Sequence, residues 1–107
     1  MTSSNSAFKI NFSTDIEYLK HSIVSKKIVA NTGGNVSLFA FDKGEALSEH
    51  TAPFDALVQI VDGRASIIID GKSHHLTDGE SIVMPANIPH ALKAEDRFKM
   101  LLTMIKG

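Results

Sequence analysis

The sequence predicts an all-β fold, an antiparallel sandwich or closed barrel made of short strands. Apolar runs recur with turn signals about every 8–12 residues, a spacing typical of sandwiches and barrels. Helical spacing of apolar residues does not persist anywhere beyond one turn, near residues 13–19. Asp70-Gly71 stands between two β-rich runs, which is the strongest short-range signal of a hairpin. Together these observations favour a fold without helices.

Each strand is expected where an apolar run lies between turn residues. Gly, Asp and Asn clusters mark the turns, because these residues tolerate the backbone conformations that turns require. The strands are expected at residues 22–30, 36–41, 54–61, 65–69, 72–76, 81–84 and 98–105. The turns between them are expected at residues 32–35, 42–44, 62–63, 70–71 and 77–79.

The Asp70-Gly71 turn also predicts a strand register. A two-residue hairpin places Ile69 opposite Lys72, and its register then follows residue by residue. Ala65, Ile67, His74 and Leu76 should share one face, the core face. The opposite face should carry Ser66, Ile68, Ser73 and His75.

Composition restricts the classes of function. The chain has 107 residues, the size of one domain, and its formal net charge of −1 provides no basic field for nucleic acid. It contains no cysteine, so disulfides and thiolate metal sites are excluded. No apolar run reaches membrane-spanning length, and the N-terminus lacks the apolar core of a signal peptide. We therefore expect a cytoplasmic protein that binds neither nucleic acid nor membranes.

Residues 1–12 are expected to form a tail, disordered or exchanged with a partner, and residues 13–107 a single domain.

Two stretches carry a recognisable pattern of residues. In the first, Gly44, His50 and Gly63 have the spacing G-x5-H-x12-G; in the second, Gly79, Pro85 and His90 have the spacing G-x5-P-x4-H. Together they resemble the two signature motifs of the cupin superfamily, and the strand order matches from about residue 36 to the end. The resemblance implies a jelly-roll β-barrel with a pocket inside. It also implies metal ligands pointing into the barrel, usually three histidines and one glutamate.

The chain departs from the motifs at four positions. The second histidine position is Ala52, and the glutamate position is Ala56. Asn87 replaces the loop glycine, and asparagine tolerates the left-handed conformation better than most residues. Ala94 replaces the final asparagine.

The resemblance therefore leaves His50 and His90 as an incomplete ligand set for a divalent metal such as Zn, Ni, Fe, Cu or Mn. Catalytic metal sites typically have three protein ligands and one open position. Asp55 and Gln59 are the nearby substitutes, but strand alternation turns both of them away from the side on which Ala56 lies. The alternative is a metal-free polar pocket in which both histidines bind an anion or a carbonyl, or relay a proton. In either case the imidazole nitrogens of the two residues should lie about 4 Å apart, the reach of two metal bonds of about 2 Å each.

Other residues allow a pocket or a plain core interpretation. Met100, Leu102 and Met104 alternate on one face of the last strand, which suits either an adaptable pocket wall or the core. His74 and His75 are adjacent in a strand and so point to opposite faces; His74 is expected at the edge of the core. His21 is expected on the surface. The predicted pocket residues are His50, Ala52, Ala56, Met84, His90 and Met100.

We thus expect a cupin barrel that binds a small molecule. The alternative is a small metal-dependent enzyme of isomerase, decarboxylase, dioxygenase or lyase type that uses His50 and His90. The residues single out no catalytic group and leave open whether the protein is an enzyme. Because two large ligands are replaced by alanine, the pocket is expected to be roomy and to favour a bulkier ligand.

A homodimer is also expected. Residues 22–30 carry apolar side chains at both parities, which suggests a strand covered on both faces, and Ile68 lies on the predicted outer face. The alternative is that residues 8–12 fold back over their own sheet.

Overall fold

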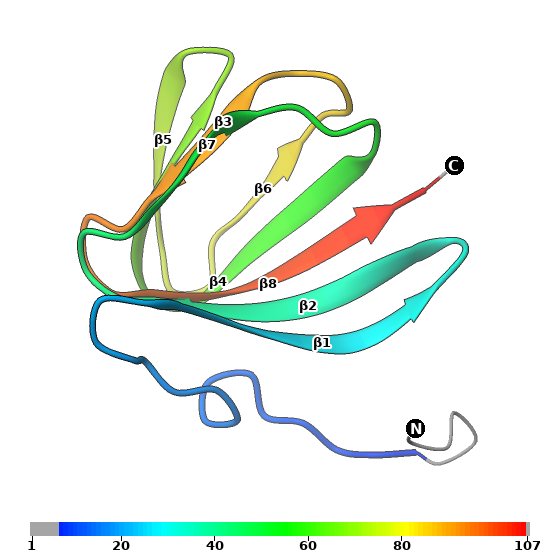
Figure 1. Cartoon of the computed structure of the whole chain (residues 1–107), viewed down its shortest axis with the longest axis vertical. Helices are drawn as coiled ribbons and strands as arrows, with labels where there is room; N and C mark the ends of the chain where they lie inside the picture. Colours follow the sequence, from blue (N-terminus) through cyan, green and yellow to red (C-terminus); the bar gives the residue numbers. More distant parts are fainter. Residues whose placement is uncertain (1–6, 107) are drawn as a thin grey trace.

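A computed structural model of the protein describes residues 7–106 and shows two antiparallel sheets curled around one interior (Figure 1). The all-β jelly-roll class predicted above is confirmed. The eight strands of the described residues are β1 (Ile23–Asn31), β2 (Gly34–Phe41), β3 (Ala46–His50), β4 (Asp55–Ile69), β5 (Lys72–Thr77), β6 (Ser81–Met84), β7 (His90–Lys93) and β8 (Phe98–Ile105). Within the same residues there is no helix of the length and hydropathy that crossing a membrane requires.

Strand β4 belongs to both sheets and joins them. Its first half pairs with β6 and β8, in the sheet that continues through β2 to β1. Its second half pairs with β5 and β7, in the sheet that ends at β3. The β1 sheet lies below the β3 sheet in Figure 1, and the interior lies between them.

The continuity of β4 corrects one expectation. A turn was predicted at residues 62–63, but the strand runs unbroken from Asp55 to Ile69. A register shift between Ile60 and Asp62 and a positive φ of 83° at Gly63 bend the strand instead of reversing it. A Cβ at Gly63 would lie 1.9 Å from the Arg97 carbonyl oxygen, so β8 approaches β4 more closely here than any other residue type allows.

The predicted β4–β5 hairpin is confirmed. Asp70 and Gly71 both have positive φ, 52° and 80°, as a type I′ turn requires. Ile69 pairs with Lys72, and Ile67 with His74, in the predicted register. Ala65, Ile67 and Leu76 are buried as expected, but His74 is exposed. Strand β5 pairs with β4 alone, so no strand packs beside His74.

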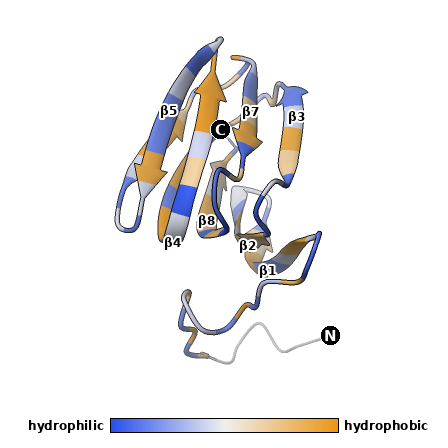
Figure 2. Ribbon diagram, turned by 90° about the vertical axis from the view of Figure 1, so that its left-hand side faces the viewer, coloured by the Kyte–Doolittle hydropathy of each residue, from blue (hydrophilic) through white to orange (hydrophobic). Residues whose placement is uncertain are grey.

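The core fills the space between the two sheets. Phe41 and Phe98 stack at its centre with ring centroids 4.5 Å apart, and neither has any exposed surface. Figure 2 shows how apolar and polar residues alternate along the strands, as expected for sheets with one face turned to a core.

Residues 7–22, here called the N-terminal segment, cover the outer face of the β1 sheet (Figure 1). Ile16 is buried there, and Ile10, Phe12 and Tyr18 pack around the same cluster as Leu38 and Leu101. Residues 7–12 thus lie over their own sheet, the arrangement expected if residues 8–12 fold back. Exchange of residues 1–12 with a partner stays a prediction. Residues 1–6 lie outside the described range.

This cover removes one argument for a dimer. Strand β1 is not buried on both faces: Val29 is 54% exposed, and Ile23, Val24 and Ile28 are only half-buried. Ile68 is likewise half-buried within one chain. The apolar residues of β1 at both parities are explained by the core on one side and the N-terminal segment on the other.

Polar contacts of Tyr18 fasten the N-terminal segment to the barrel. The Tyr18 hydroxyl donates a hydrogen bond to Asp62 Oδ2 at 2.5 Å, and the Arg97 guanidinium lies 4.1 Å from the ring centroid. The partly buried Lys99 ammonium donates to the Ser13 carbonyl. Burial, followed by the hydrogen bond to Asp62, raises the pKa of Tyr18 well above its usual range.

The raised pKa of Tyr18 predicts how stability depends on alkaline pH. A tyrosine whose pKa is raised by folding stabilises the protein fully below the unfolded pKa, about 10, and loses that contribution as pH rises beyond it. Tyr18→Phe should therefore cost about 1 kcal/mol of unfolding free energy below pH 10, from the lost hydrogen bond. The difference should shrink above pH 10. Urea unfolding of both proteins measures it. Because Tyr18 is the only tyrosine, tyrosinate absorbance follows its ionisation directly. Ionisation of Tyr18 in the folded protein at the ordinary tyrosine pKa of about 10 would contradict the argument.

Candidate functional site

His50 and His90 lie opposite each other on neighbouring strands. They are Cα partners at the end of β3 and the start of β7, and their ring centroids are 4.3 Å apart with the rings nearly edge to face. His90 is buried, 6% exposed, whereas His50 lies at the mouth and is exposed. The two rings therefore lie close together, whereas the expected distance between their nitrogens stays a prediction.

Backbone hydrogen bonds determine which nitrogen of each ring is free. His50 Nδ1 lies 2.7 Å from the Ser48 carbonyl oxygen, and His90 Nδ1 lies 3.1 Å from the Ile88 carbonyl oxygen. A carbonyl oxygen only accepts, so Nδ1 of each ring carries the proton. In the neutral ring Nε2 then presents a lone pair, ready to accept a hydrogen bond or to bind a metal.

The loop before β7 places His90. Asn87 has a positive φ of 64°, which confirms that asparagine serves at the glycine position of the motif. The backbone N–H of Asn87 donates to the Ala52 carbonyl at 2.8 Å, and the backbone N–H of Ala86 donates to Asp55 Oδ1 at 2.9 Å. These bonds hold the loop against residues 52–55, so both histidines approach the same end of the barrel.

One cavity joins all six residues predicted for the pocket. Its volume is about 80 Å³, and apolar side chains form most of its wall. It is lined by Phe39, Leu47, His50, Ala52, Phe54, Ala56, Met84, His90, Leu92, Met100, Leu102 and Met104. Their part in binding a ligand stays a prediction.

Strand alternation in the sequence identifies some of the remaining residues that line the cavity but not others. Leu92 follows His90 by two residues, and Phe54 lies midway between Ala52 and Ala56, so alternation along a strand identifies both. Leu47 could not be found this way, because it is three residues from His50. A register shift between Leu47 and His50 brings both side chains to the same cavity.

The expectation of a roomy pocket is wrong. A cavity of about 80 Å³ is well below the roughly 300–1,000 Å³ of typical small-molecule sites, and below the ~150 Å³ that holds benzene in an engineered cavity. The wall explains the difference, since Phe54, Met84 and Met104 fill the space beside the two alanines. The cavity suits a ligand of only a few heavy atoms.

The ligand set that the motifs imply for a divalent metal is not present. Among residues 7–106, no three His, Asp or Glu side chains gather where they could hold one ion. Asp55 is exposed and accepts the hydrogen bond from the Ala86 amide, and the register through residues 55–60 is regular, so no bulge turns it inward. Two imidazoles without a carboxylate do not fit the usual three-ligand site.

The other histidines lie away from the cavity. His21 and His74 are exposed, and His75 Nδ1 lies 2.9 Å from Glu95 Oε1 on the surface. An exposed pair of this kind contributes little to stability.

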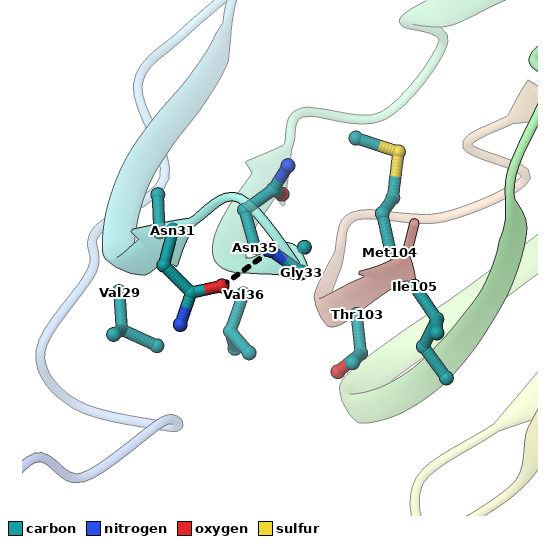
Figure 3. A pocket seen from close by; sticks show the side chains of 10 residues that line it. Val29, Asn31, Gly33, Asn35, Val36, Thr103, Met104 and Ile105 are labelled. Carbon is teal, nitrogen blue, oxygen red and sulfur yellow. Dashed lines mark hydrogen bonds between the residues drawn. The ribbon is translucent and has the colours of Figure 1, made fainter. Parts of the chain in front are cut away.

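A second hollow lies at the far end of β1, β2 and β8 (Figure 3). Its volume is about 230 Å³, and Val29, Val36, Met104 and Ile105 contribute to its wall. The Asn31 side chain accepts a hydrogen bond from the Gly33 amide at 2.7 Å, which shapes the turn at its edge (Figure 3). No titratable side chain lines it, so it offers no group for acid–base or ligand chemistry. Met104 contributes to the walls of both hollows.

Comparison with known proteins agrees with this barrel. The sequence profile of the cupin domain matches residues 37–106. The chain belongs to the cupin family. Among curated proteins, no match was found.

Solved structures resemble most of the chain. A conserved protein of unknown function from Streptococcus pyogenes shares 34% identity at a TM-score of 0.89, over 95% of this chain and 90% of its own. A cupin 2 conserved barrel domain protein from Leptotrichia buccalis shares 46% identity at a TM-score of 0.88, over 91% of this chain. This chain covers 47% of the Leptotrichia protein, about half its length.

Enzymes also occur among the more distant structures. Salicylate 1,2-dioxygenase from Pseudoaminobacter salicylatoxidans, in adducts with gentisate, shares 15% identity at a TM-score of 0.74, over 82% of this chain and 26% of its own. At this identity the likeness shows the fold alone.

Proposed function

We propose that this cupin is a binding module that holds one small organic molecule in its barrel cavity. The observation that carries the proposal is that two histidines, whose Nδ1 atoms are occupied by backbone carbonyls, line a cavity whose other walls are apolar. Such a combination, an apolar wall with few polar groups, is typical of ligand sites. The apolar wall takes the body of the ligand, and the histidine pair takes its polar group.

The chemistry of the pair limits the polar group. A neutral ring accepts a hydrogen bond at Nε2 from a hydroxyl or an N–H group, whereas a protonated ring donates one to a carboxylate. The cavity volume limits the body to a short branched or linear chain. Isobutanol and isobutyrate are therefore suitable probes, one neutral and one anionic.

A titration followed by NMR tests the binding proposal. Amide signals of Ala52, Ala56 and Leu92 should shift on addition of at least one of the two probes. His50→Ala/His90→Ala should weaken binding about tenfold per lost hydrogen bond, that is, about 1.4 kcal/mol each, and leave the thermal unfolding temperature within a few degrees. The matched control is His74→Ala/His75→Ala, which should bind as the parent does. Shifts confined to the second hollow, or binding unchanged by loss of both cavity histidines, would contradict the proposal.

A metal-dependent enzyme is the second candidate. The observation that favours it is the 4.3 Å separation of the two rings with both Nε2 atoms unoccupied by backbone partners. Against it stand Ala52 and Ala56 at the remaining ligand positions. The distant enzyme structures contribute only the fold to this argument.

We also propose a homodimer, now through a different surface. Side chains of Val83, Leu57, Thr103, Val36 and Val29 follow one another across the outer face of the β1 sheet. The ends of this row are open: Val83 is 57% exposed and Val29 is 54% exposed. An uncharged, mainly apolar row can pair with a second copy of itself about a two-fold axis.

Light scattering at micromolar concentration tests the dimer. The expected mass is twice the 11.6 kDa of one chain. Val83→Glu should shift the protein to monomers, since it places a charge in the row that pairs, whereas Phe8→Glu should not. A monomeric parent protein would reject the dimer.

A further inference from the structure

Two methionines occupy the neighbourhood of the missing carboxylate. Ala56, at the glutamate position of the motif, has Met84 of β6 as its cross-strand partner on one side and Met104 of β8 on the other. Directly opposed residues on one face have Cβ atoms about 4.5–5.5 Å apart. Met84 is 4% exposed, Met104 is partly buried, and both line the same cavity as His50 and His90.

The charge of this donor set decides which ion suits it. Two neutral imidazoles and two thioethers carry no charge, and no Asp or Glu lines the cavity. The cost of transferring an ion into an apolar site rises with the square of its charge, so an uncharged set favours a monovalent ion over a divalent one. Thioether sulfur is a soft donor that selects Cu(I), whereas hard ions such as Mg²⁺ and Mn²⁺ require oxygen ligands.

We propose that the barrel cavity binds one Cu(I) ion through Nε2 of His50 and His90 and the thioether sulfur of Met84 or Met104. The proposal goes beyond the proposed function and rests on the part of it that assigns the polar contacts to the same two Nε2 atoms. It involves binding only and no change of oxidation state. The exposed ring of His50 at the mouth gives the ion an entry from solvent.

An anaerobic competition titration tests this proposal. Untagged protein carrying His74→Ala/His75→Ala, which removes the surface histidine pair, is titrated with Cu(I) against the chromophoric chelator bicinchoninate, in the presence of ascorbate. The expected result is one equivalent bound, with Cu(I) preferred over Zn(II). In that background His50→Ala/His90→Ala should weaken Cu(I) binding by roughly 100-fold or more, about 2.7 kcal/mol.

The thioethers are tested by replacing sulfur without changing volume. Met84→Leu/Met104→Leu is a nearly volume-conserving change that should leave the urea midpoint close to that of the parent. It should weaken Cu(I) binding about tenfold. Unchanged Cu(I) affinity in this variant, or tighter binding of Zn(II) than of Cu(I) by the parent, would overturn the proposal.

The two probes separate this proposal from the proposed function. If an organic probe binds in a histidine-dependent way but Cu(I) does not, only the metal inference fails. If Cu(I) binds as described but neither organic probe does, the organic ligand fails and the histidine–thioether site stands.

Discussion

Gly63→Ala should lower the free energy of unfolding by about 3–5 kcal/mol, a large share of the 5–15 kcal/mol typical of a domain. Two effects combine. The φ of 83° is costly for any residue with a Cβ, and that Cβ would lie 1.9 Å from the Arg97 carbonyl oxygen and 2.8 Å from Phe98 Cα. Both contacts are to backbone, so relief requires separating β4 from β8.

Gly79→Ala is the matched control for the steric part. Gly79 has a φ of 85°, nearly the same, but a Cβ there would have nothing within 4 Å. This variant should lose only about 1–2 kcal/mol, the cost of the left-handed conformation. Urea unfolding of both variants gives the difference. Equal losses of unfolding free energy in the two variants would contradict the close approach of β8 to β4 at Gly63.

Ala52→His/Ala56→Glu should create the divalent metal site that the cupin motifs imply. Both alanines line the cavity with His50 and His90, so the two substitutions complete the three histidines and one glutamate that the cupin motifs imply. Three imidazoles and a carboxylate suit Zn²⁺, and the carboxylate supplies the missing negative charge. We expect Zn²⁺ affinity to rise by about 1,000-fold or more, or roughly 4 kcal/mol.

Calorimetric titration with Zn²⁺ measures this gain. The control is Ala52→Leu/Ala56→Gln, which adds similar volume without the new ligands, and its unfolding temperature shows what overpacking alone costs. A folded Ala52→His/Ala56→Glu protein with no more affinity for Zn²⁺ than this control would contradict the placement of the four positions around one point.

Much of the barrel could be predicted because its determinants are local. Asp70-Gly71 determines a turn type by itself, and the turn then determines the register of β4 against β5. The last strand was predicted at its observed bounds, residues 98–105, because its alternation is uninterrupted. By contrast, Asp62-Gly63 has the same composition as a hairpin turn, yet it bends β4, because β8 pairs with β4 up to Gly63 and β5 pairs with it from Arg64 onward. That pairing is a long-range contact that no local pattern contains.

The candidate site likewise has features that motif spacing predicts and features that depend on long-range packing. His50, Ala52, Ala56 and His90 could be placed from motif spacing, and all of them line one cavity. Its small size could not be foreseen, since it depends on where the side chains of Phe54 and Met84 come to rest. The N-terminal segment was also undecided, because its few apolar residues suit a neighbouring chain as well as their own sheet.

The central claim is that the Nε2 atoms of His50 and His90 both face the barrel cavity, and histidine-ring NMR tests it most directly. Long-range ¹H–¹⁵N correlation spectra distinguish the two tautomers of each neutral ring. The structure predicts a proton on Nδ1 of both His50 and His90, held by the Ser48 and Ile88 carbonyls, and ring contacts to the methyl groups of Ala52 and Ala56. A proton on Nε2 of either ring in the ligand-free protein, with no contact to these methyl groups, would contradict the account.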